Sequence, residues 1–114
     1  MGKIVRHTIV RDIYQKARLT TALYRAQKSR SVYPLVANLF VTHRCNASCT
    51  YCYVEIEKKL TNEFSLDQWK TLVDDLYDRG TRMFTLVGGE PFLYKQIDEL
   101  IAHIAAKNVF LNLT

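Results

Sequence analysis

The sequence lacks any long apolar run, and its N-terminus has no apolar stretch of the kind found in secretory signals. A membrane-spanning helix needs about 20 predominantly apolar residues, so we expect no transmembrane segment. Cysteine is also scarce, with three residues that all fall within eight positions. A disulfide scaffold would spread an even number of cysteines along the chain, whereas clustered thiols in a reducing compartment favour a metal site. The sequence therefore predicts a cytoplasmic protein without a disulfide framework.

What the sequence does have is an ordinary globular composition with an uneven distribution of charge. Hydrophobic residues make up 48% of the chain and charged residues 24%, which is typical of a folded domain. Residues 1–44 carry nine Lys or Arg and one acid, whereas residues 45–114 carry seven Lys or Arg and ten acids. A basic N-terminal segment can contact RNA, an anionic membrane surface or an acidic partner, but a solvated helix face is the simpler interpretation. We expect no nucleic-acid partner.

Hydrophobic periodicity predicts an N-terminal helix followed by alternating strands and helices. The first helix is basic and amphipathic, with Ile9, Ile13 and Tyr24 near one apolar face. Ser65 and Gln68 form a capping-box pattern at the start of the second helix. The predicted elements are helix 8–30, strand 35–42, helix 65–78, strand 82–87, helix 94–107 and strand 109–113.

The order of these elements indicates an α/β fold, in which strands that alternate with helices form a parallel sheet. The apolar run 35–42 fits a strand that is buried on both faces. We divide the chain into a basic helical extension, residues 1–33, and a core domain, residues 34–114. We expect the helix to pack against the outside or the N-terminal end of the core. Because the third strand would have an open edge, we expect the natural protein to continue beyond Thr114.

A three-cysteine motif follows the first predicted strand. Cys45, Cys49 and Cys52 have the spacing C-x3-C-x2-C. Thiolates are soft ligands suited to an iron–sulfur cluster or to zinc. Three thiolates on a four-iron cluster leave one iron open to an outside ligand, whereas most cluster proteins supply four cysteines. The rival is a closed zinc site with His43 as the fourth ligand, although His43 lies only two residues before Cys45.

A second motif, Gly88-Gly89-Glu90-Pro91, follows the second predicted strand. Glycine lets a backbone approach a ligand closely, and proline fixes its own φ and removes a donor. Taken alone, the motif would indicate a plain strand-to-helix turn. Because parallel strands point the same way, however, it should emerge at the same edge of the sheet as the cysteine loop. In barrel-type folds that C-terminal edge carries the active site.

Together, the two motifs resemble those of the radical S-adenosylmethionine superfamily. The family signature is C-x3-C-x2-C, usually with an aromatic residue before the last cysteine, which is the position of Tyr51. The resemblance implies a [4Fe–4S] cluster that is held by Cys45, Cys49 and Cys52. The residues that would line the methionine end of bound S-adenosylmethionine are Gly88, Gly89, Glu90 and Pro91.

The resemblance also implies a fold and a reaction. The family core is a partial (β/α)6 TIM-like barrel, and this chain would supply its first two units and third strand, truncated. Reductive cleavage of S-adenosylmethionine at the cluster gives a 5′-deoxyadenosyl radical. This radical abstracts hydrogen from a substrate, here a peptide, a cofactor precursor or another small metabolite. The residues that flank the cysteines look like the subgroup that modifies peptides or builds cofactors, and a reductant such as flavodoxin or ferredoxin is expected.

Other interpretations stay open on the sequence. The chain could be a zinc-binding interaction module, or a non-catalytic iron–sulfur module that transfers electrons or binds a partner. Arg44, next to the first cysteine, could tune the cluster or hold a carboxylate.

Overall fold

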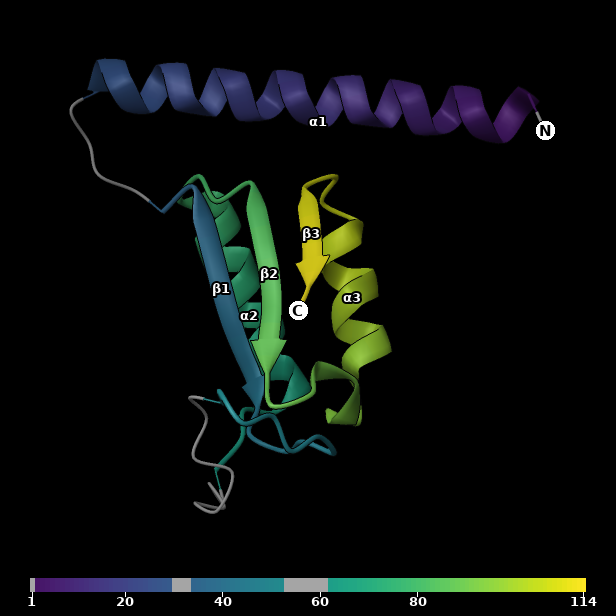
Figure 1. Ribbon diagram of the computed structural model, residues 1–114. Helices are drawn as coiled ribbons and strands as arrows, with labels where there is room; N and C mark the ends of the chain where they lie inside the picture. The colour runs from purple at the N-terminus through teal and green to yellow at the C-terminus, as the bar shows by residue number, and fades with distance from the viewer. Residues whose placement is uncertain (1, 30–33, 53–61) are drawn as a thin grey trace.

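The computed structural model describes residues 2–29, 34–52 and 62–114, with side chains of the N-terminal helix described from Thr8 onward. The elements follow in the order α1 (Gly2–Ser29), β1 (Val36–Thr42), α2 (Leu66–Asp78), β2 (Met83–Gly88), the 3-10 helix η1 (Pro91–Leu93), α3 (Ile97–Ala105) and β3 (Phe110–Leu113) (Figure 1). The predicted α/β class is confirmed.

The three strands form one parallel sheet in the order β1-β2-β3. A register shift between Phe40 and Thr42 marks an irregularity at the C-terminal end of β1. Helix α2 lies behind β1 and β2 in Figure 1 and contacts α3. Among the described residues the sheet is open, so the partial barrel stays a prediction, as does the division at residues 33 and 34.

The hydrophobic core lies between the sheet and its helices. Val73 of α2, Leu100 and Ile104 of α3, and Phe84 and Leu86 of β2 have no exposed surface. Burial alternates from Val36 to Val41, where every second residue is more exposed, and both Val41 and Thr42 are buried at the end of the strand. The prediction that this strand is buried on both faces was wrong, because α2 and α3 cover only one face of the sheet.

Helix α2 begins and ends as its sequence predicts. The Ser65 hydroxyl accepts a hydrogen bond from Gln68 N at 3.3 Å, and the Gln68 side chain accepts one from Ser65 N at 2.9 Å. These reciprocal bonds form the predicted capping box. After the helix, Gly80 adopts a φ of 117°, which a side chain would strain.

The third predicted helix begins later than expected. Residues 91–93 form η1, and Tyr94 then adopts an extended backbone with ψ 118°, so α3 starts only at Ile97. The predicted helix at 94–107 therefore included the bend and turn at residues 94–96 and two turn residues after the nine-residue α-helix.

Helix α1 lies across the N-terminal ends of the strands (Figure 1). It meets the core through polar side chains, because Gln15 Nε2 donates to Val109 O at 3.0 Å and Arg18 Nη1 donates to Lys107 O at 3.2 Å. Arg18 also donates to the Tyr77 hydroxyl. The predicted apolar face points elsewhere, since Ile13 is 62% exposed.

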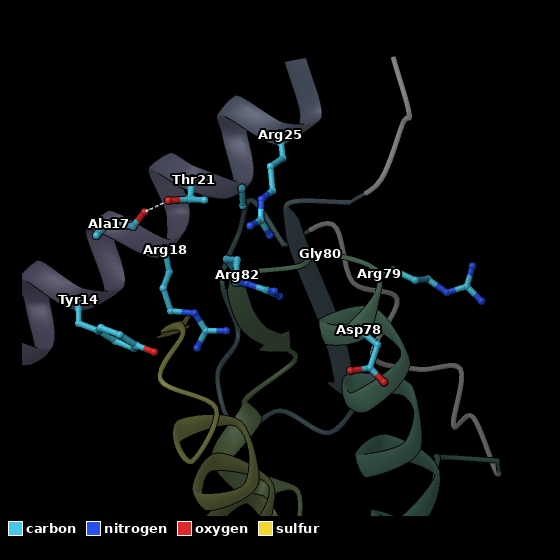
Figure 2. Close-up of a pocket in the computed structure, with 10 residues that line it drawn as sticks. Tyr14, Ala17, Arg18, Thr21, Arg25, Asp78, Arg79, Gly80 and Arg82 are labelled. Carbon is cyan, nitrogen blue, oxygen red and sulfur yellow. Dashed lines mark hydrogen bonds between the residues drawn. The ribbon is translucent and has the colours of Figure 1, made fainter. Parts of the chain in front are cut away.

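A hollow of about 420 Å³ lies beside this contact, between α1 and the start of β2 (Figure 2). Four arginines line it, two from α1 and two from the core: Arg18, Arg25, Arg79 and Arg82. Within the described part of the chain, no helix combines the length and the hydrophobicity needed to cross a membrane.

The capping box gives a direct test of helix stability. Replacing Ser65 by Ala removes the acceptor for Gln68 N, so we expect the free energy of unfolding to fall by about 1 kcal/mol. Urea denaturation followed by circular dichroism measures this change. The control is Thr71→Ala in the same helix, whose exposed hydroxyl donates only to Asp67 O. Its effect should stay within about 0.5 kcal/mol, and equal losses in both variants would contradict the capping role.

Candidate active site at the C-terminal edge of the sheet

The two signature segments begin side by side. Thr42, the last residue of β1, pairs in register with Gly88, the last residue of β2. The cysteine loop and the glycine turn therefore leave the same edge of the sheet, at the bottom of Figure 1. This confirms the placement that parallel strands predict.

Backbone hydrogen bonds fasten the glycine turn to the base of the cysteine loop. Gly89 N donates to Thr42 O at 2.8 Å, and Glu90 N donates to Arg44 O at 2.7 Å. Both distances are short for N–H···O bonds, so the two segments are closely held. The second bond reaches the residue that directly precedes Cys45.

The two glycines are required by this close approach. A Cβ on Gly88 would lie 2.6 Å from Thr42 O, and a Cβ on Gly89 would lie 2.4 Å from Arg44 O. Backbone oxygens cannot turn aside as the end of a flexible side chain can. From the sequence, the glycines were expected to let the backbone approach a ligand. The structure shows that glycine is needed at both positions because the neighbouring backbone leaves no space for a Cβ.

Glu90 shapes the turn that follows. Its Oε1 accepts a hydrogen bond from Phe92 N at 3.1 Å and so caps η1, where Pro91 occupies the first position. Proline suits this position because the first turn of a helix has no use for its missing N–H. The carboxylate is therefore tied into the turn itself.

Glu63 is a residue that the sequence analysis missed. Its Oε1 accepts from the buried Thr42 hydroxyl at 2.5 Å, and its Oε2 accepts from Arg44 Nη2 at 2.5 Å. Thr42 Oγ1 in turn accepts from Arg44 N at 3.1 Å. Arg44 does hold a carboxylate, as suspected, but no local pattern identifies a partner 19 residues away.

This pairing shifts the pKa values of both charged groups. The hydrogen bond from Arg44 lowers the pKa of Glu63, the bond from Thr42 lowers it further, and burial acts in the opposite direction. The hydrogen bond to Glu63 raises the pKa of Arg44. Glu63 is therefore ionised at neutral pH and holds the start of the cysteine loop through two charge-assisted contacts.

A third link joins the segment around Glu63 to the glycine turn. The Tyr94 hydroxyl, just after η1, donates to Phe64 O at 3.1 Å. Burial raises the pKa of Tyr94, so the hydroxyl keeps the proton that it donates. Residues 42–44, 63–64 and 88–94 thus form one hydrogen-bonded unit.

The three cysteines lie on the loop that follows this unit. Cys45 is half-buried, Cys49 and Cys52 are exposed, and no disulfide is present in the described parts of the chain. Cys52 N donates to Cys49 O at 3.2 Å, and Ala47 N donates to Cys45 Sγ at 3.4 Å. Tyr51 is 87% exposed.

Three cysteine thiols fit an iron–sulfur cluster as ligands, although the described structure does not bring them together into a metal site. Within residues 2–29, 34–52 and 62–114, no three His, Cys, Asp or Glu side chains form a metal site. Metal binding commonly orders its own ligands, and an exposed loop can close around a cluster. His43, the rival zinc ligand, packs its ring against Phe40 with centroids 4.6 Å apart.

Residues 39–114 match the Radical SAM superfamily. The chain belongs to this superfamily, whose members bind a [4Fe–4S] cluster and S-adenosylmethionine. The resemblance inferred from the two motifs is thereby confirmed. The expected positions of cluster ligands and cofactor contacts stay predictions for this chain.

Curated relatives are about one-third identical to this chain over the matched residues. The antilisterial bacteriocin subtilosin biosynthesis protein AlbA of Bacillus subtilis is 34% identical over 65% of this chain and 16% of its own length. The sporulation killing factor maturation protein SkfB of the same strain is 35% identical over 72% and 20%. A PqqA peptide cyclase of Xanthomonas euvesicatoria is 37% identical over 70% and 22%. The chain thus spans about a fifth of the length of these relatives.

A solved structure shares the fold. Streptococcus suis SuiB, in a crystal structure with bound S-adenosylmethionine, superposes with a TM-score of 0.63 at 19% identity. The match covers 82% of this chain and 21% of SuiB. At this identity the likeness supports the α/β arrangement alone.

The tight glycine turn can be tested by adding one methyl group. In Gly89→Ala the Cβ would overlap Arg44 O, so we expect the turn to separate from the cysteine loop and the free energy of unfolding to fall by about 1–3 kcal/mol. Amide hydrogen exchange should show faster exchange at Glu90, whose N–H loses its acceptor. Ser48→Ala, on the exposed part of the same loop, serves as the control. Unchanged exchange at Glu90 in the Gly89 variant would contradict the proposed contact.

The Glu63 pairing predicts a pH-dependent stability. Because its folded pKa is lowered, Glu63 stabilises the fold above its unfolded pKa, and this stability is lost as pH falls through the folded value. Glu63→Gln should cost about 1 kcal/mol at pH 7, and the difference from wild type should shrink below about pH 4.3. Urea denaturation of the apo-protein across this range measures it. The exposed Glu99→Gln is the control, and a difference that is independent of pH would rule out the charged pairing.

Proposed function

We propose that this chain forms the N-terminal part of the catalytic core of a radical S-adenosylmethionine enzyme that acts on a peptide. The observation that carries the proposal is the hydrogen-bonded unit that holds the cysteine loop against the Gly88–Pro91 turn at one edge of the sheet. The names of the relatives favour a peptide, since they describe bacteriocin biosynthesis, killing-factor maturation and cyclisation of a peptide. A cofactor precursor or another small metabolite is the second choice.

We assign the cluster to Cys45, Cys49 and Cys52, and the methionine end of S-adenosylmethionine to the turn from Gly88 to Pro91, with Tyr51 beside it. When bound and reduced, the cluster supplies the electron that cleaves S-adenosylmethionine into methionine and a radical that abstracts hydrogen. Flavodoxin or ferredoxin is the expected reductant.

The residues of the chain itself would position the cluster and the cofactor. The bond from Glu90 N to Arg44 O fixes the turn beside the residue that precedes Cys45. Glu63 holds Arg44 from the other side. The cluster and the cofactor would therefore meet at a junction whose geometry the backbone sets before either is bound, which limits the reorganisation that reaction requires.

The open face of the sheet offers a place for substrate. Asn38, Thr85 and Asn112 are neighbours in register across the three strands. Asn38 and Asn112 are exposed, and Thr85 is partly exposed. These side chains belong to the face of the sheet that α2 and α3 leave uncovered. Side-chain amides and a hydroxyl can donate to and accept from a peptide backbone, so we place the substrate over this row.

Anaerobic reconstitution of the complete gene product tests the assignment. We expect about four irons and matching sulfide per chain, and an EPR spectrum of the reduced protein that changes when S-adenosylmethionine is added. Cys49→Ala should lose most of the iron, whereas Ser48→Ala, the adjacent control, should keep it. Tight zinc with no iron uptake would establish the interaction module instead. An iron–sulfur spectrum indifferent to S-adenosylmethionine would favour a non-catalytic electron-transfer module.

A further inference from the structure

Helix α1 carries an apolar surface that the core does not use. The large apolar side chains of this helix that are at least half exposed are Ile9, Val10, Ile13, Tyr14, Leu23 and Tyr24. Val10 is 67% exposed and Ile13 is 62% exposed. A contiguous set of such side chains on one element commonly marks an interaction site.

Except for Tyr14, which lines the hollow between α1 and the core, these side chains face away from the core. At 3.6 residues per turn, Ile9, Ile13 and Tyr24 fall on the side of α1 opposite Gln15 and Ala22. Gln15 donates to Val109 O, and both Gln15 and Ala22 are half-buried. The helix therefore points most of its large apolar side chains outward, while a mixed side that includes Gln15, Leu19 and Ala22 rests on the ends of the strands (Figure 1).

The exposed apolar side is accompanied by positive charge. Between Thr8 and Ser29, α1 has five Lys or Arg and one acid. Arg11, Arg18 and Arg25 recur at seven-residue spacing and so follow one flank of the helix. A second copy of the same helix would bring like charges together, which disfavours self-association through this face.

The arginine-lined hollow opens along this flank. Figure 2 shows Arg25 reaching down from α1 toward Arg82. Arg82 donates to the carbonyl oxygens of Tyr77 and Thr81, and Arg18 to a carbonyl and a hydroxyl oxygen. Neither guanidinium is paired with a carboxylate among the described residues, although Asp78 also lines the hollow, so positive charge predominates there. Guanidinium groups match phosphate geometry well.

We propose that α1 docks the protein on an anionic membrane surface. Its outward apolar side chains enter the boundary between headgroups and acyl chains, and the exposed Lys16 and Lys28 that border them contact lipid phosphates. Amphipathic helices that combine exposed apolar residues with Lys and Arg bind membrane surfaces in this way, and two such signals hold better than one. Because α1 spans the N-terminal ends of the strands, the cysteine edge points away from the bilayer.

The test is co-sedimentation of the complete protein with lipid vesicles. We expect binding to vesicles of phosphatidylcholine and phosphatidylglycerol in equal parts, and much weaker binding to phosphatidylcholine alone. The double variant Ile9→Gln/Ile13→Gln should bind about tenfold more weakly, because it removes apolar burial. Lys16→Gln, an exposed cation beside Ile9 and Leu23 on the helical wheel, should weaken binding to the anionic vesicles about fivefold.

Val36→Gln is the matched control, since Val36 and Ile9 are both 52% exposed but Val36 lies on β1. It should bind as wild type does, and unchanged circular dichroism verifies that each variant folds. Absence of binding to anionic vesicles, or full binding by the double variant, would overturn the proposal. A dimer in lipid-free solution that the double variant abolishes would identify a second copy as the occupant and would overturn it equally.

Discussion

The close contact between the ends of β1 and β2 is the constraint on which the candidate site depends. Gly89 N and Glu90 N donate to carbonyl oxygens of residues 42 and 44, and a Cβ on Gly88 or Gly89 would overlap these same oxygens. The contact exists because the strands are parallel and in register, and that register is held by Phe84 and Leu86 in a fully buried core. The geometry of the site therefore depends on the register of the strands, and the register depends on the packing of the core.

The two ends of the sheet have different physical characters. The C-terminal edge gathers backbone donors and acceptors, three thiols and the Arg44–Glu63 pair, which suits chemistry on a bound cofactor. The N-terminal end is covered by α1, which presents apolar and cationic side chains outward. A helix that exposes most of its large apolar side chains is suited to hold the domain against another surface, so the proposed docking surface and the proposed reaction site lie at opposite ends of the sheet.

Local patterns in the sequence predicted the features that depend on neighbouring residues. The Ser65 capping box, the parallel strands and the shared edge of the two motifs all follow from short-range spacing. The sequence did not reveal Glu63 as the partner of Arg44, because that contact crosses a loop. It placed α1 on the outside or at the N-terminal end of the core, where the structure has it, but periodicity identifies an apolar face without showing which face meets the core. Likewise, the two glycines indicate a tight turn, but the sequence does not show that the neighbouring backbone leaves no space for a side chain there.

The most direct test of the account is a crystal structure of the complete protein, reconstituted anaerobically with S-adenosylmethionine, with data collected at the iron absorption edge. The account predicts anomalous density for a four-iron cluster bonded to Cys45, Cys49 and Cys52, with one iron free of protein ligands and the methionine end of the cofactor against Gly88–Pro91. A zinc ion with four protein ligands, or iron held away from this edge, would contradict it.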